Sequence, residues 1–496
     1  MRAFKITGNS IFSDAELTKV TAPFERRVIT AEELQEVRYR LTLYYVDRGY
    51  INSGAVIPDQ HVADGIIKLR IVEGKLTAVD VTGNEGFRSK YLRGRIAPET
   101  GTVLNLPEVQ ERLQLLQQDP LIARINARLA PGARPGESAL KVNVAEENPF
   151  DVAFAIANDR PPSVGAERAE VYVAHRNLTG WGDTLGVRYG HSLTSSADDV
   201  AGFYSRPLNA RDTTISLSAS RSDSTVIEEP FTTLDIDSEL TSYEIALTHP
   251  LYLTPEQSFT VGLALNRRHS ETFLLGRPFS FSPGAQDGKA TATVLRLSQG
   301  WSNRSLVQVL AASSTFSLGV DALDATQSGG AQPDGQFFSW LGQFQWARRL
   351  NDSGNQFIFR SDLQLAEDPL LPLEQFAVGG ASTVRGYREN QLVRDNGFVA
   401  SAEFRITVLR LPIPSLSRTV EDGFVQLAPF ADFGWAENTD IATPDHTAIA
   451  SVGLGLRWDP SSNLHAEIYW GYGLQDIDTL NEDLQESGIH FRVQVF

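Results

Sequence analysis

From Phe150 to the C-terminus, apolar and polar residues alternate in runs of about 8–12 residues, separated by polar stretches rich in Gly and Pro. Three clear examples are TISLSAS (residues 214–220), FIFRSDLQL (357–365) and AIASVGLGLRW (448–458). Successive side chains of a strand point to opposite faces, so each run predicts a strand with one apolar and one small or polar face. Helical patterning is weak across this region, and the pattern therefore favours an all-β unit.

We predict sixteen strands in this region. An even number is typical of closed bacterial membrane barrels, in which both ends of the barrel lie on one side of the membrane. Sixteen strands leave a lumen wide enough for water, or for a plug and an extended chain. The predicted strands begin near Phe150, Ala169, Asp183, Val200, Arg211, Ile236, Ser258, Ala290, Leu306, Phe337, Gln356, Phe398, Phe424, Ala448, Leu464 and Ile489.

Alternation alone does not separate a membrane barrel from a soluble β-sandwich or propeller. Two features favour the membrane. The runs are about as long as a tilted strand needs to cross a bilayer. Aromatic residues also lie near predicted strand ends, where an interfacial girdle is expected; examples are Trp301, Trp435, Trp458 and Trp470.

The first 149 residues contain a repeated unit of about 75 residues. FKITGNSIFSDAEL (residues 4–17) and LTAVDVTGNEGFRSKYL (76–92) each read as a short strand, a Gly-Asn turn and the start of a helix. A second helix and two strands follow in each copy. In the first copy, Thr30 and Glu33 have the spacing of a helix capping box. The predicted order is therefore β-α-α-β-β, twice.

Charge is distributed unevenly between these two regions. Residues 1–149 hold 20 Lys+Arg and 19 Asp+Glu, whereas the remainder holds 24 and 42. This contrast indicates two modules in different surroundings, and neither has the basic surface of a nucleic-acid-binding protein.

The chain has no cysteine, which excludes disulfides and Cys-ligated metal sites. It also has no run of about 18 apolar residues, so we expect no transmembrane helix.

The stretch GGASTVRGYREN (residues 379–390) falls in the long gap between predicted strands eleven and twelve, residues 366–396. A gap of this length indicates an extracellular-side loop, or a loop that folds back into the barrel. Inside a barrel, Arg385 would need a carboxylate partner, because an unpaired buried charge is costly. In strand thirteen, FVQLAPFADFGW, alternation places Asp432 on the lumen wall and Gly434 beside it, which leaves room for close approach.

These motifs together resemble a known family. The two repeats with Gly-Asn openings are similar to POTRA domains, the periplasmic modules that precede outer-membrane barrels. With the VRGY motif (Val384, Arg385, Gly386, Tyr387) and the F-x-D-x-G motif (Phe430, Asp432, Gly434), the whole chain resembles the two-partner secretion transporters, TpsB or the ShlB/FhaC/HecB family. The resemblance implies POTRA domains at residues 1–75 and 76–149 and a sixteen-stranded barrel at 150–496. It also implies that Arg385 lies at the tip of an inward-folded loop and pairs with Asp432.

The same resemblance implies a transporter in the outer membrane of a Gram-negative bacterium, with its POTRA domains in the periplasm. Such a protein captures an unfolded, extended exoprotein (TpsA-like) and exports it through the barrel without ATP. Expected partners are that exoprotein, outer-membrane lipid and, during biogenesis, periplasmic chaperones and the barrel-assembly machinery; we expect a monomer. The alternative is an assembly or insertion factor of the same superfamily. A passive porin would not need the repeats.

Enzymatic chemistry finds little support. The sequence has no G-x-S-x-G elbow and no H-E-x-x-H motif, so we expect no catalytic residue, metal or cofactor.

The chain departs from the family at both ends. It starts directly at the first POTRA strand, without the usual N-terminal plug helix and linker. It ends with Phe496, the expected C-terminal assembly signal, but Phe491, Val493 and Val495 alternate in the opposite register to the usual one.

Overall fold

The computed structural model describes residues 1–62, 64–97, 101–134, 136–329, 332–420, 422–477 and 483–496. The chain divides into two compact units. The first comprises Met1–Pro149 with Thr179–Gly182, and the second comprises Phe150–Leu178 with Asp183–Phe496. In these described ranges, every helix is too short or too polar to span a bilayer.

The first unit contains the predicted β-α-α-β-β order twice. Each copy has a three-stranded sheet, β1-β3-β2 in the first and β4-β6-β5 in the second, whose central strand is parallel to one neighbour and antiparallel to the other. The elements are β1 (Ala3–Thr7), α1 (Asp14–Thr21), α2 (Ala31–Val46), β2 (Gly54–Val56) and β3 (Ile66–Val72), then β4 (Lys75–Thr82), α3 (Ser89–Ile96), α4 (Leu106–Gln117), β5 (Ile122–Pro131) and β6 (Glu137–Glu146). A short 3-10 helix, Ala22–Phe24, follows α1.

The two Gly-Asn turns are built in the same way. The side-chain amide of each asparagine donates to the carbonyl oxygen three residues later, at 2.9 Å for Asn9 and 2.6 Å for Asn84. One carboxylate then accepts backbone N–H groups of each loop. Glu73 accepts two, at 2.7 and 2.9 Å, and Glu146 accepts three, at 2.8–3.1 Å. The same turn therefore forms in both copies: the asparagine amide bonds within the turn, and a glutamate at or just after the end of the copy's central strand accepts the N–H groups of the loop.

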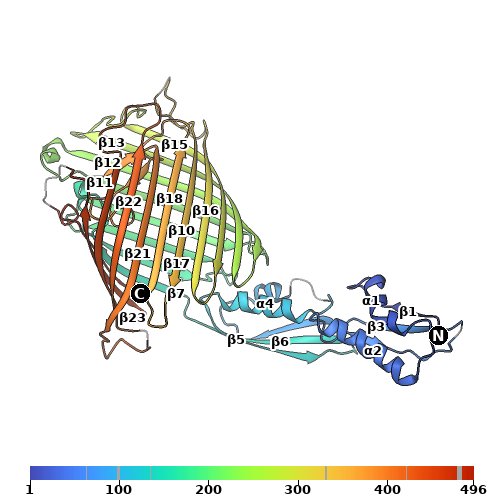
Figure 1. The fold of residues 1–496 in the computed structure, drawn as a ribbon. Coiled ribbons are helices and arrows are strands. Elements are labelled where there is room, and N and C mark those ends of the chain that lie inside the picture. The colour runs from blue at the N-terminus through green and yellow to red at the C-terminus, as the bar shows by residue number, and fades with distance from the viewer. Residues whose placement is uncertain (63, 98–100, 135, 330–331, 421, 478–482) are drawn as a thin grey trace. The chain divides into compact units, whose positions relative to one another are not determined.

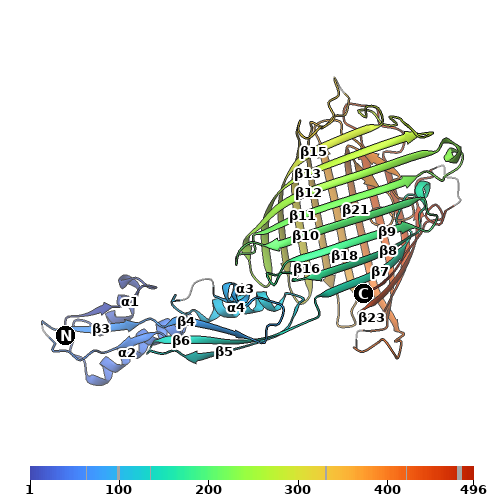
Figure 2. The same cartoon turned by 180° about the vertical axis from the view of Figure 1, so that it is seen from behind.

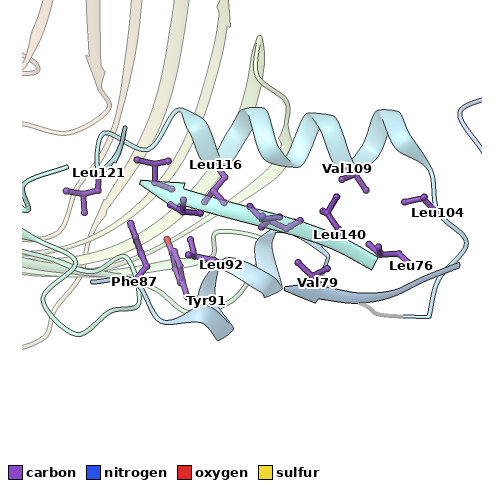
Figure 3. Close-up of a cluster of buried hydrophobic side chains, with 14 residues drawn as sticks. Leu76, Val79, Phe87, Tyr91, Leu92, Leu104, Val109, Leu116, Leu121 and Leu140 are labelled. Atoms are coloured by element: carbon purple, nitrogen blue, oxygen red, sulfur yellow. The ribbon is translucent and has the colours of Figure 1, made fainter. Parts of the chain in front are cut away.

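Each copy packs its helices on one face of its sheet. The predicted capping box at Thr30 and Glu33 is present at the start of α2. In the second copy, Val109 and Leu116 on α4 point toward Leu140 on β6, as Figure 3 shows. Burying such aliphatic side chains contributes roughly 1.5–3 kcal/mol each, which makes these contacts the main source of stability for so small a sheet.

The second unit is a closed antiparallel barrel of sixteen spanning strands. Figure 1 shows the wall that contains β16–β18 and β21–β23, and Figure 2 shows the wall that contains β8–β13. The strands are β7 (Phe150–Ala157), β8 (Arg168–Arg176), β9 (Thr184–Ser192), β10 (Ala197–Pro207), β11 (Thr214–Thr225), β12 (Ile236–Leu253), β13 (Gln257–Leu274), β15 (Lys289–Arg304), β16 (Gln308–Gly319), β17 (Phe338–Arg349), β18 (Gln356–Ala366), β21 (Asn396–Arg410), β22 (Phe424–Glu437), β23 (Ala448–Ser461), β24 (Leu464–Gly473) and β25 (Ile489–Val495). Two short 3-10 helices, Pro162–Val164 and Phe231–Leu234, lie in loops.

Every spanning strand begins within three residues of its predicted position. The structure differs from the prediction in the length of some strands and in one additional short strand. The strands β12 and β13 have 18 residues each, more than the 9–11 that a tilted strand needs to cross a bilayer. They pair with each other over almost their full length, so backbone pairing continues where the hydrophobic pattern ends. A two-residue strand, β14 (Arg277–Pro278), pairs back onto the end of β13 and was not predicted.

The long gap predicted between strands eleven and twelve is residues 367–395, called here the long loop. It contains a short hairpin, β19 (Phe376–Val378) paired with β20 (Leu392–Arg394). The VRGY motif lies in the segment between these two short strands. The loop side chains Val378, Val384 and Leu392 are buried, and they pack with wall residues of the barrel in one apolar cluster. The long loop therefore lies against the inner wall.

Candidate functional site

Arg385 is the centre of the candidate site. Its side chain is 4% exposed, and its guanidinium makes a two-point contact with the carboxylate of Asp432: Nε to Oδ2 at 2.8 Å and Nη2 to Oδ1 at 2.9 Å. The backbone N–H of Arg385 also donates to Asp432 Oδ2, at 3.1 Å. Paired N–H···O bonds of this kind fix both the position and the plane of the guanidinium.

A second carboxylate, Glu403 on β21, was missing from the sequence prediction. It contacts Arg385 Nη1, and it also accepts from Arg405 Nε at 2.7 Å and from the Tyr469 hydroxyl at 3.3 Å. The alternation of β21 indicates from the sequence that Glu403 faces the lumen. Its proximity depends on the register, however, because Glu403 lies opposite Phe430 and Ser401 lies opposite Asp432. A register of this kind is set by the pairing of whole strands.

Aromatic rings complete the surroundings of Arg385. The guanidinium carbon lies 3.7 Å from the centroid of the Phe430 ring and 4.7 Å from that of Tyr469. A weakly hydrated guanidinium stacks well on aromatic faces, and desolvation strengthens the cation–π attraction. This contact gives a physical role to the phenylalanine of the F-x-D-x-G motif. The loop motif and the wall motif therefore meet through a bidentate ion pair and a stacked ring.

Glycines allow the loop to approach the wall this closely. A Cβ atom at Gly434 would lie 2.8 Å from the Val384 side chain and closer still to Val378. Gly386 has a φ of 96°, which favours glycine, and a Cβ there would lie 2.9 Å from the backbone of Gly471 on β24. The glycine of the VRGY motif thus allows a contact between two backbones, and the glycine that ends the wall motif leaves space for the Val378 and Val384 side chains of the loop.

Tyr387 fixes the loop to the neighbouring strands. Its hydroxyl donates to the carbonyl oxygen of Ala450 at 3.0 Å, and it accepts the backbone N–H of Gln475 at 2.9 Å. Gly473 leaves space for the ring, because a Cβ there would lie 2.8 Å from it. All four residues of the VRGY motif are therefore engaged with the wall: Val384 by packing, Arg385 by charge, Gly386 by close approach and Tyr387 by hydrogen bonds.

The next residue, Arg388, makes a separate and more exposed contact. Its Nη atoms lie 2.8 and 3.1 Å from the two carboxylate oxygens of Glu228, in the segment between β11 and β12. Nη1 also lies 3.3 Å from Glu486, in the segment between β24 and β25. Beside it, the backbone N–H of Glu389 donates to the Gln485 side chain at 2.8 Å. The long loop is thus tied to two other loops as well as to the wall.

Phe496 lies apart from this site. Strand β25 ends at Val495, and the ring of Phe496 makes an edge contact with His465, with centroids 5.6 Å apart. Val493 and Val495 are exposed on the opposite face. The role of Phe496 as an assembly signal stays a prediction.

Comparisons with known proteins agree with this architecture. A family model described as "Haemolysin secretion/activation protein ShlB/FhaC/HecB" matches residues 136–458, and "POTRA domain, ShlB-type" matches residues 1–74. The chain is similar to the outer membrane transporter CdiB of Dickeya dadantii (strain 3937), with 22% identity across 83% of this chain and 73% of that protein.

Two solved structures share the fold over this whole chain. One is CdiB from Escherichia coli, with a TM-score of 0.76, 22% identity and 90% of that chain covered. The other is CdiB from Acinetobacter baumannii, with a TM-score of 0.68, 16% identity and 89% of that chain covered.

Proposed function

The chain belongs to the ShlB/FhaC/HecB family of haemolysin secretion/activation proteins, and we propose that it exports one unfolded exoprotein from the periplasm to the cell surface through its barrel. As a member of this family it is an outer-membrane transporter with POTRA domains in the periplasm, not an enzyme. The finer steps are our proposal: the POTRA domains capture an extended TpsA-like chain, and that chain crosses the barrel without ATP.

The observation that carries this proposal is the long loop on the inner wall. A secretion pore has to stay closed to small solutes and still admit a polypeptide. A loop held by one buried arginine suits this task, because a single group holds or releases the whole segment. Removing one partner of a buried ion pair typically costs about 3–5 kcal/mol, so the closed arrangement is well defined without being permanent.

We assign capture to residues 1–149 and conduction to residues 150–496. Support for capture comes from β5, a ten-residue strand that pairs only with β6 among the described strands. An open strand edge binds an extended peptide through backbone hydrogen bonds with little regard to sequence. We further propose that the transporter acts as a monomer in outer-membrane lipid, and that chaperones and the barrel-assembly machinery, which reads Phe496, insert it.

The test is a quantitative comparison of the culture medium and the outer membrane, with and without the gene. We expect one large exoprotein to vanish from the medium while the other outer-membrane barrels keep their abundance. A joint fall of many barrels would instead indicate an assembly factor of the same superfamily. Complementation with the intact gene should restore the exoprotein, which controls for effects on neighbouring genes.

A further inference from the structure

The long loop is also held at a second place on the barrel wall, by Glu374. This side chain is 6% exposed, and its carboxylate lies 2.6 Å from Arg296 Nη2 on β15 and 3.4 Å from Arg268 Nη1 on β13. Arg268 also donates to the carbonyl oxygen of Leu373. Arg385 instead contacts β21 and β22, and β16, β17 and β18 separate β15 from β21 in the sheet. The loop is therefore anchored on two separate parts of the wall, by charges of opposite sign.

A second buried carboxylate, Asp395, lies where the loop ends, between β20 and β21. It is 0% exposed, and it accepts the backbone N–H of Leu370 at 3.0 Å and that of Thr439 at 2.8 Å. It also accepts the side-chain amide of Gln375 at 2.9 Å. Several donors compensate for the cost of burying this charge, and they hold the end of the loop in one place.

One side-chain amide joins the two ends of the loop. Nε2 of Gln364, on β18, lies 3.1 Å from the carbonyl oxygen of Glu374 and 3.0 Å from that of Asp395. An NH₂ group has two hydrogens and can serve both acceptors. Everything between these two carbonyl groups, including the β19–β20 hairpin and the VRGY motif, is therefore closed off at its base by a single side chain of the wall.

The base of the loop also has its own apolar contacts. Leu370 and Leu371 are fully buried, and they pack with residues of β15 and of a neighbouring loop: Ala290, Ala292, Val294 and Phe337. The buried side chains of the hairpin belong to a different cluster, the one that includes Val378 and Val384. The base and the hairpin are thus packed as two separate units.

We propose that Glu374 and Asp395 form a fixed hinge, and that release of Arg385 moves only the hairpin, residues 376–394, as one body. The proposal rests on the proposed function and names the part of the long loop that moves to admit a polypeptide. Hinge motions are concentrated in a few residues at the ends of the moving element. Because Arg385 and Glu374 have different partners, losing the contacts of one leaves those of the other in place. The hairpin then returns to the same site on the wall after a chain has passed.

The test measures distances between two spin labels in the purified full-length transporter by double electron–electron resonance. The chain has no cysteine, so a pair of introduced cysteines carries the only labels. Leu306→Cys, at a 97% exposed residue between β15 and β16, gives the reference position. The second label is at Ser382→Cys in the hairpin or at Pro372→Cys in the base, both exposed residues. We expect Arg385→Ala to broaden the distance distribution of the Ser382 label at least about twofold and to leave that of the Pro372 label unchanged.

Glu374→Gln, added to Arg385→Ala, tests the hinge itself. It removes the carboxylate that two wall arginines share, so we expect the distance distribution of the Pro372 label to broaden as well. Arg296→Gln in the same background should give a similar result. Combining Glu374→Gln with Arg296→Gln should add little, because the two changes remove the same contact.

Glu367→Gln is the matched control, because Glu367 is an exposed carboxylate of the same loop that has no ion-pair partner among the residues that the structure describes. Equal broadening at both labels in Arg385→Ala alone, or none at either, would overturn the hinge. Equal behaviour of the Glu374 and Glu367 variants would overturn it too. The measurement needs no exoprotein, so its failure is separate from failure of the export function, which the gene comparison tests.

Discussion

Arg385 and Arg388 lie three residues apart in the long loop, but they hold it in different ways. Arg385 is 4% exposed and lies between two carboxylates of the barrel wall and an aromatic ring. Arg388 is 20% exposed and reaches Glu228, itself 19% exposed, in one loop and Glu486, which is 2% exposed, in another. A charge pair gains little in water and is screened by salt, whereas removing one partner of a buried pair is expensive. We therefore propose that the buried arginine fixes the loop and that the outer arginine adds a smaller contribution to its hold.

The largest effect should come from Arg385→Ala. Asp432 would then be left buried without its cation, and Glu403 would keep only Arg405, at a cost of about 3–5 kcal/mol to the inward position of the loop. We expect the barrel to assemble at a normal level in the outer membrane while export of the exoprotein falls sharply. The measurement is exoprotein in the medium per transporter in the membrane.

Asp432→Ala should behave like the arginine variant, since it breaks the same pair from the other side. Arg385→Lys is the informative control, because an ammonium keeps the charge but loses the two-point contact and the stacking on Phe430. Full export by both alanine variants would show that export does not depend on the Arg385–Asp432 pair.

Glu403→Gln should have a smaller effect. The Arg385–Asp432 pair remains, and only one charged hydrogen-bond acceptor is lost, at a cost of roughly 1.5–3 kcal/mol. We expect partial export and a faster exchange of the loop between positions, measured as more frequent openings in single-channel recordings. If this variant were as defective as Arg385→Ala, the two carboxylates would contribute equally and Asp432 would not be the principal partner.

Gly471→Ala tests the close approach of the loop rather than its charge. A Cβ at this position would lie 2.7 Å from the backbone of Arg385, and overpacking of this kind costs about 1–3 kcal/mol. We expect the same partial loss of export as in the Glu403 variant, with all charged groups intact. Gly300→Ala is the control, since a Cβ there meets nothing within 4 Å; equal behaviour of the two variants would contradict a loop that is pressed against β24.

Arg388→Gln should have the smallest effect. The pair with Glu228 is partly exposed and contributes about 1 kcal/mol, and the glutamine amide keeps an N–H donor for Glu486, which is 2% exposed. Export should stay near normal, and openings should become somewhat more frequent. Raising the salt concentration should produce the same change in the wild type and little further change in the variant, because the Debye length shortens with ionic strength. A salt response that persists unchanged in the variant would show that the outer pair is not its source.

The sequence predicts the barrel well because alternation is local. Each strand carries its own pattern, so the start of β22 at Phe424 is found without knowledge of its neighbours. The partner of Arg385 could be sought on physical grounds, since a lumen arginine needs a carboxylate and Asp432 faces inward. Glu403 needed the register between β21 and β22, which depends on the whole sheet. The contact of Arg388 joins residues 160 positions apart in two loops, where no periodicity constrains the partner.

We propose that the long loop must move for a polypeptide to pass through the barrel. The chain has no cysteine, so Arg388→Cys with Glu228→Cys would introduce the only two thiols, at partly exposed positions whose present side chains contact each other. A short bismaleimide can then bridge the two loops in intact cells. We expect export to proceed before bridging, to stop in the bridged double variant and to continue in each single variant treated with the same reagent. Undiminished export through fully bridged transporters would contradict it.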